Sequence, residues 1–144
     1  MLKRSRLMAP GTDTCIGRPR LLKLMGRPHK ITLLAAPAGF GKSTLASAWL
    51  NDCRGLQGWL SLDASDRDGT SLWLHLITCL RRARADFGTA LLPLLALENA
   101  VPPGLIDRLV EEVAEWRQDA PQDQLYLVLD DLHSLDDGTN LPLL

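Results

Sequence analysis

The sequence predicts an α/β fold in which helices cover a parallel sheet in three layers. Three observations carry this prediction: a glycine-bearing loop at residues 36–43, an apolar run ending in two aspartates at residues 125–131, and helical periodicity in the segments between them. Continuous apolar runs are typical of strands buried on both faces of a parallel sheet. Helices that alternate with such strands complete an α/β/α arrangement.

The loop reads Ala-Pro-Ala-Gly-Phe-Gly-Lys-Ser, which has the pattern of a phosphate-binding loop apart from an alanine at its first position. Gly39 and Gly41 allow the backbone to curl, so that its N–H groups can surround a phosphate. We expect Lys42 to contact the β- and γ-phosphates of ATP and Ser43 to bind Mg²⁺. The residues expected to line the nucleotide are Ala38, Gly39, Phe40, Gly41, Lys42, Ser43 and Thr44.

The flanking segments have the order that a phosphate-binding loop requires. Residues 31–35 form a short β-type apolar run, and we expect a strand there. After the loop, Leu45 and Trp49 are four residues apart, which is typical of a helix. A helix that begins at the loop directs the positive end of its dipole at the bound anion. The alternative is that the loop is only a glycine-rich turn.

Residues 125–131 read Leu-Tyr-Leu-Val-Leu-Asp-Asp and resemble a Walker B strand. Ligands of α/β folds bind at the carboxyl ends of the strands. We therefore expect Asp130 to hold Mg²⁺ through its water shell and Asp131 to orient or deprotonate the attacking water. A strand can also end in an acidic turn, so this assignment depends on the upstream loop. Together the two segments predict a P-loop NTPase fold that binds ATP and Mg²⁺.

The remaining segments supply the other elements. We expect a short helix from Pro19 to Met25, a strand at residues 58–62, and a helix that Asp68 or Thr70 caps. A second long helix is expected from residue 104 to 116, where apolar residues recur at helical spacing. Residues 90–97 are apolar but contain a proline, which predicts a helix–loop connection.

Composition narrows the class of protein. The chain has 144 residues, 46% of them hydrophobic and 23% charged, and its net charge of −1 gives no electrostatic reason to expect nucleic-acid binding by this segment. Three cysteines without metal-type spacing indicate reduced thiols. We find no pattern of a signal peptide and no apolar run long enough to span a membrane, so we expect a cytoplasmic protein.

Four segments together resemble the N-terminal ATPase domain of large LuxR-type transcriptional regulators of the maltose-regulon-activator kind. These segments are residues 31–49, 58–63, 114–116 and 125–133. The resemblance implies a signal-transduction ATPase in which ATP drives a switch and the intact parent protein self-associates. It also implies that DNA is bound only through a C-terminal helix-turn-helix, which no segment of this chain provides.

The family has a sensor strand, a winged helix and a repeat domain after its Walker B strand, and the sequence contains none of these. We therefore expect an N-terminal segment at residues 1–17 and a C-terminally incomplete P-loop domain at residues 18–144, without ATPase activity of its own. Two alternatives stay open. One is a free-standing P-loop or AAA-type ATPase or kinase, and the other is a remnant of the family that binds no nucleotide.

Overall fold

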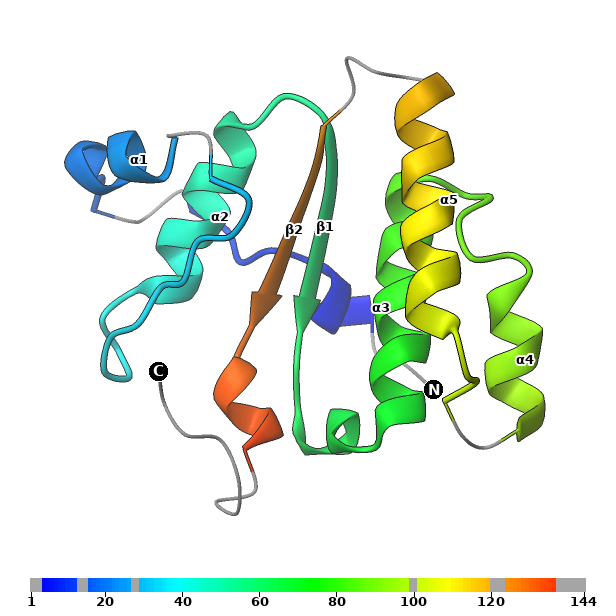
Figure 1. Cartoon of the computed structure of the whole chain (residues 1–144). Helices are drawn as coiled ribbons and strands as arrows, with labels where there is room; N and C mark the ends of the chain where they lie inside the picture. The colour runs from blue at the N-terminus through cyan, green and yellow to red at the C-terminus, as the bar shows by residue number, and fades with distance from the viewer. Residues whose placement is uncertain (1–3, 13–15, 27–28, 99–100, 120–123, 137–144) are drawn as a thin grey trace. The chain divides into compact units, whose positions relative to one another are not determined.

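Figure 1 shows the computed structural model, which describes residues 4–12, 16–26, 29–98, 101–119 and 124–136. The chain forms two compact units. We call Ala9–Arg54 the loop unit, because it contains the phosphate-binding motif. We call Met1–Met8 together with Gly55–Leu144 the sheet unit.

The sheet unit contains a parallel sheet that, in the described part of the chain, has two strands, β1 (Leu56–Ser61) and β2 (Leu125–Asp130). The register places Leu56 opposite Leu125 and Ser61 opposite Asp130. Both strands therefore end at the same edge of the sheet, which we call the carboxyl edge. The sequence predicted both strands, and β1 begins and ends slightly earlier than expected.

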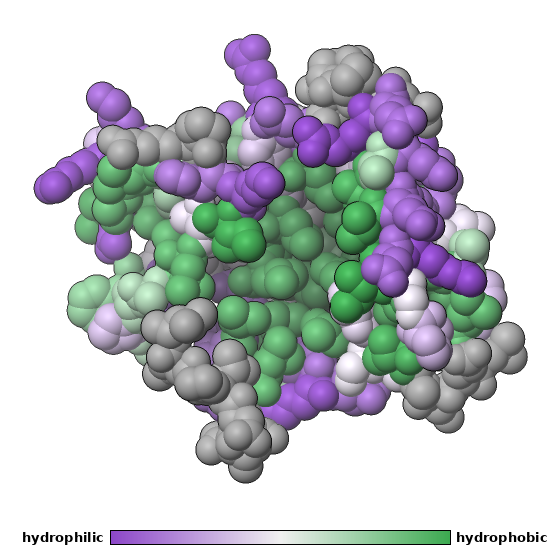
Figure 2. All heavy atoms as spheres, in the orientation of Figure 1, coloured by the Kyte–Doolittle hydropathy of each residue, from purple (hydrophilic) through white to green (hydrophobic). Residues whose placement is uncertain are grey.

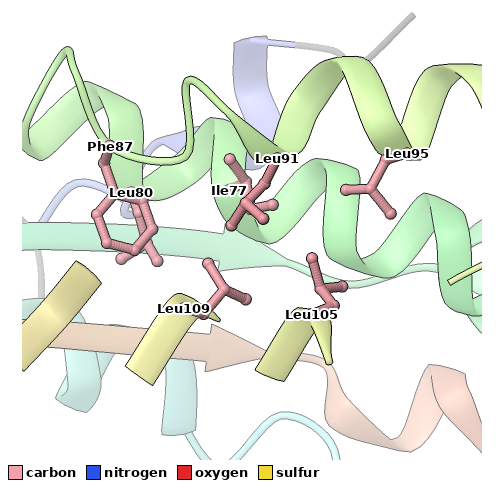
Figure 3. Close-up of a cluster of buried hydrophobic side chains, with 7 residues drawn as sticks. All are labelled: Ile77, Leu80, Phe87, Leu91, Leu95, Leu105 and Leu109. Atoms are coloured by element: carbon pink, nitrogen blue, oxygen red, sulfur yellow. The ribbon is translucent and has the colours of Figure 1, made fainter. Parts of the chain in front are cut away.

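Three helices complete the sheet unit: α3 (Gly69–Ala83), α4 (Leu91–Glu98) and α5 (Leu105–Asp119). The expected cap of α3 is confirmed, because the Asp68 carboxylate accepts a hydrogen bond from the Ser71 N–H at 3.1 Å. The helices share a buried cluster, drawn in Figure 3, that consists of Ile77, Leu80, Phe87, Leu91, Leu95, Leu105 and Leu109. Leu125 and Leu127 of β2 pack against this cluster, so the sheet and the helices have a common core.

Gly58 of β1 explains how closely α3 approaches the sheet. A Cβ atom at this position would lie 3.1 Å from the Cys79 Sγ of α3 and 3.1 Å from a methyl group of Leu127. The Cys79 thiol also donates a hydrogen bond to the Trp59 carbonyl oxygen at 3.3 Å. A Cβ at Gly58 would require the side chains of Cys79 and Leu127 to shift by a few tenths of an ångström, so glycine permits the present packing.

The prediction of a helix–loop connection at residues 90–97 was wrong, because Leu91–Glu98 is helical. Pro93 is the third residue of α4 and therefore lies in the first turn. The N–H groups of a first turn have no acceptor within the helix, so a proline there removes no helical hydrogen bond.

The loop unit contains α1 (Pro19–Met25) and α2 (Lys42–Asp52), and its buried apolar residues are Met25, Ala46 and Leu50. The sequence predicted both helices. The predicted strand at residues 31–35 is wrong, because this segment joins no ladder in the described structure. Ile31 and Leu33 are 88% and 76% exposed. A β-type run becomes a strand only where a neighbouring strand accepts and donates its backbone hydrogen bonds.

Three short 3₁₀ helices complete the element list: η1 (Arg4–Leu7), η2 (Ala64–Arg67) and η3 (Leu132–Leu135). All three belong to the sheet unit. The first two follow or approach the end of β1, and the third follows β2 directly. They therefore surround the carboxyl edge.

Candidate nucleotide site

The phosphate-binding motif forms a turn with two left-handed glycines immediately before α2. Gly39 has a φ of +80° and Gly41 has a φ of +74°, in the region that residues with a Cβ rarely adopt. A Cβ at Gly39 would meet no atom within 4 Å, so the backbone angle and not the available space requires glycine there. The motif thus has glycine at the two positions where the backbone adopts a left-handed conformation.

Lys42, the first residue of α2, folds back over the beginning of the loop. Its ammonium group donates hydrogen bonds to the carbonyl oxygens of Ala36 at 2.7 Å and Pro37 at 3.0 Å. The Lys42 charge therefore lies beside the backbone of the first two residues of the loop. Phosphate oxygens are stronger acceptors than neutral carbonyls, so an anion could replace them as partners of the ammonium group.

Ser43 and Thr44 follow in the first turn of α2. The Leu45 N–H donates to the Gly41 carbonyl oxygen at 2.9 Å, which is the first bond of the helix. Residues before Leu45 therefore present their N–H groups at the positive end of the helix dipole. Phe40 is 58% exposed, and Ala38 is exposed beside it. The seven residues expected to line the nucleotide thus lie in one continuous turn.

The two candidate acids lie at the carboxyl edge of the sheet unit. Asp130 is the last residue of β2, and its carbonyl oxygen accepts a hydrogen bond from the Leu62 N–H at 2.9 Å. Asp131 has a φ of +57°, which makes it the one described residue other than glycine with a positive φ. Its N–H donates to the Asp130 carboxylate at 3.1 Å, and its own side chain is exposed.

A further group at this edge was missed by the sequence analysis. The Asp66 side chain is fully buried, and its carboxylate binds the Arg6 guanidinium, the His75 Nδ1 at 2.6 Å and the Asp63 N–H at 2.8 Å. The spacing of Asp63 and Asp66 matches a capping box, which is the local signal that was available. Hydrogen bonds from Ser65 lower the pKa of the exposed Asp63 carboxyl below its usual value.

Comparison with known proteins identifies the relatives of the chain. The HTH-type transcriptional regulator MalT of Vibrio parahaemolyticus is 34% identical over 134 residues, which are 90% of this chain and 14% of that protein. MalT of Klebsiella pneumoniae is 34% identical over 137 residues, and MalT of Vibrio cholerae is 32% identical over 139 residues. These matches cover 92% and 94% of this chain and 14% and 15% of the two regulators. No protein-family model matches.

The chain is homologous to one region of the MalT regulators. The resemblance to large regulators of this kind is therefore confirmed, and the match is to one region of the relatives. The chain spans 14–15% of the length of the MalT proteins reported above. The name of these relatives describes whole proteins, so their activity does not follow for the MalT-type region alone.

Two further findings concern metal ligands and membrane spans among the described residues. Within the described residues, no group of three or more His, Cys, Asp or Glu side chains is placed to hold a metal ion. Mg²⁺ commonly keeps several waters and takes one or two carboxylates together with substrate phosphates, so such a cage is not required for it. No described helix is both long and apolar enough to cross a membrane.

Proposed function

We propose that this chain is the ATP-binding module of a MalT-type transcriptional regulator. The observation that carries the proposal is the turn before α2, where Gly39 and Gly41 both have positive φ and the Lys42 ammonium group is held over the loop. An anion at this turn would meet backbone N–H groups, a helix N-terminus and a fixed positive charge.

The roles within the site follow from charge and position. Lys42 binds the β- and γ-phosphates, and the amides of residues 38–44 surround them. Ser43 and Asp130 bind Mg²⁺, directly and through water respectively. Asp131 orients or deprotonates the water that attacks the γ-phosphate. The finer fold assignment, a P-loop NTPase, is part of this proposal, as are self-association and DNA binding by the whole regulator.

Replacement of Lys42 tests the proposal. Lys42→Ala removes a charge-assisted contact worth roughly 1.5–3 kcal/mol, so ATP affinity should fall by about one to two decades. Lys30→Ala is the matched control, because Lys30 is an exposed lysine of the same loop unit and its loss changes the net charge equally. Calorimetric titration with ATP measures both variants.

The control distinguishes a local contact from a general effect of charge. The proposal requires Lys30→Ala to bind ATP like the parent chain. Equal affinity of the two variants would mean that Lys42 does not contact the phosphates. Absence of ATP binding by the parent chain would reject the proposed function.

A further inference from the structure

A buried ionic cluster joins the N-terminal segment to the carboxyl edge of the sheet unit. At its centre the Asp66 carboxylate, which is 0% exposed, is bound by Arg6 of η1, by His75 of α3 and by the Asp63 N–H at the start of η2. The partners come from segments that are up to 60 residues apart in the sequence. The cluster therefore holds together elements that the chain order does not bring together.

Arg6 makes further contacts around this carboxylate. Its Nε donates to the Ser61 carbonyl oxygen at 2.8 Å, and its Nη1 lies 3.2 Å from the Asp63 carboxylate. The Arg6 side chain is only 13% exposed. One guanidinium group thus binds the last residue of β1, the first residue of the following turn and the buried carboxylate.

Leu7, the residue after Arg6, also binds the N-terminal segment to the rest of the sheet unit. The Leu7 carbonyl oxygen accepts a hydrogen bond from Arg82 of α3 at 2.9 Å, and the Leu7 side chain packs against the buried residues Leu60, Leu62 and Cys79. We call Arg4–Leu7 the strap. Withdrawal of the strap would leave the Asp66 carboxylate buried without the Arg6 guanidinium, which is unfavourable. We therefore expect the turn at η2 to rearrange whenever the strap leaves its docked position.

The strap contacts the end of β1, which pairs with the strand that carries the candidate metal residue. Ser61, whose carbonyl oxygen Arg6 holds, is opposite Asp130 in the sheet, and the Leu62 N–H binds the Asp130 carbonyl oxygen. In the chain the strap ends two residues before Ala9, the first residue of the loop unit.

We propose that the strap regulates the candidate metal residue: docking through Arg6 holds the carboxyl edge of the sheet unit in the arrangement in which Asp130 binds Mg²⁺, and docking and Mg²⁺–ATP binding favour each other. This inference rests on the proposed function. By linkage, whatever stabilises the docked strap raises the affinity for Mg²⁺–ATP, and Mg²⁺–ATP stabilises the docked strap to the same degree.

The experiment uses the full chain and three variants. Arg6→Ala removes the guanidinium group that binds Asp66, Asp63 and Ser61. Arg6→Lys keeps the positive charge but loses the several N–H donors of the guanidinium group. Arg4→Ala is the matched control, because Arg4 is an exposed arginine of the same strap. Hydrogen exchange of residues 61–67 is measured without nucleotide and with Mg²⁺–ATP. Calorimetry then compares the affinity for ATP in the presence of Mg²⁺ and in the presence of a chelator.

We expect Arg6→Ala to increase exchange of residues 61–67 and to weaken Mg²⁺–ATP binding by about tenfold, with Arg6→Lys in between. Affinity for ATP without Mg²⁺ should not change, since the phosphate-binding turn belongs to the loop unit. Arg4→Ala should resemble the parent chain in every measurement. If Arg6→Ala does not fold by circular dichroism, Arg6→Lys against Arg4→Ala makes the same comparison.

Two results would overturn the inference. Equal exchange in Arg6 and Arg4 variants would show that Arg6 does not fasten the strap. Faster hydrogen exchange of residues 61–67 in Arg6→Ala with an unchanged affinity for Mg²⁺–ATP would show that the strap is a structural contact without a regulatory role. Failure of the parent chain to bind ATP rejects the proposed function and the coupling together, whereas exchange without nucleotide still decides whether Arg6 fastens the strap.

Discussion

A methyl group added at Gly39 tests the geometry of the phosphate-binding turn. Gly39 has a φ of +80°, and a Cβ built there has no atom within 4 Å, so Gly39→Ala introduces no clash. The only perturbation is the preference of alanine for negative φ. Left-handed backbone costs an L-residue roughly 1–2 kcal/mol.

The free-energy cost of positive φ for alanine at position 39 should appear as a lower affinity for ATP. An alanine at position 39 can relax to negative φ in the free loop, because the loop is exposed, and must return to positive φ when phosphate binds. The return costs the same ~1–2 kcal/mol, which corresponds to a loss of ATP affinity of about 5- to 30-fold. The free energy of unfolding of Gly39→Ala should change little. Alanine lowers the conformational entropy of the unfolded chain, and this stabilises the folded state by roughly 0.4–1 kcal/mol, which offsets part of any backbone strain.

Gly17→Ala is the matched control for this test. Gly17 belongs to the same loop unit, a Cβ there also meets no atom within 4 Å, and its φ lies outside the left-handed region. Calorimetry with ATP and thermal unfolding by circular dichroism measure both variants. Equal ATP affinity of Gly39→Ala and Gly17→Ala would refute the claim that this turn binds phosphate with its present backbone.

The remaining predictions concern the acids and a buried thiol. Asp130→Asn should remove the contribution of Mg²⁺ to ATP binding, whereas Asp131→Asn should bind normally and slow hydrolysis in a full-length relative; identical behaviour of both variants and the parent would reduce the pair to a turn. Burial raises the pKa of the Cys79 thiol to about 11, so iodoacetamide at pH 8 should label Cys79 only after unfolding. The stability that the neutral thiol contributes is complete below its unfolded pKa and declines as pH rises towards 11, and rapid native labelling of Cys79 would contradict its burial.

Features set by local chemistry could be predicted from the sequence. The turn before α2 needs glycine at two positions, the cap of α3 needs an aspartate, and α1 begins with a proline, so each left a signal within a few residues. Both strands that pair in the structure were also recognisable: β2 is an uninterrupted apolar run that ends at two aspartates, and β1 contains the apolar pair Trp59 and Leu60 before a polar end. The carboxyl edge with Asp130 and Asp131 follows from that pattern.

Features set by distant partners could not be predicted in the same way. Arg6 and Asp66 are 60 residues apart, and nothing near Arg6 distinguishes it from Arg4. The run at residues 31–35 has the composition of a strand, but composition does not supply a neighbouring strand. Pro93 was taken as a helix breaker because its position within α4 depends on where the helix begins.

The exposed run at residues 31–35 separates two parts of the proposed function. Ile31 and Leu33 are largely exposed, yet the turn that follows them still has its two left-handed glycines, and Lys42 is still folded over the loop. The conformation of the turn and the position of Lys42 therefore do not require a ladder at residues 31–35. Hydrolysis has a stricter requirement, because it needs an acid and a water held against the γ-phosphate by a rigid sheet. Within the proposed function, ATP binding therefore depends on the turn and α2, whereas turnover depends in addition on how completely the sheet forms.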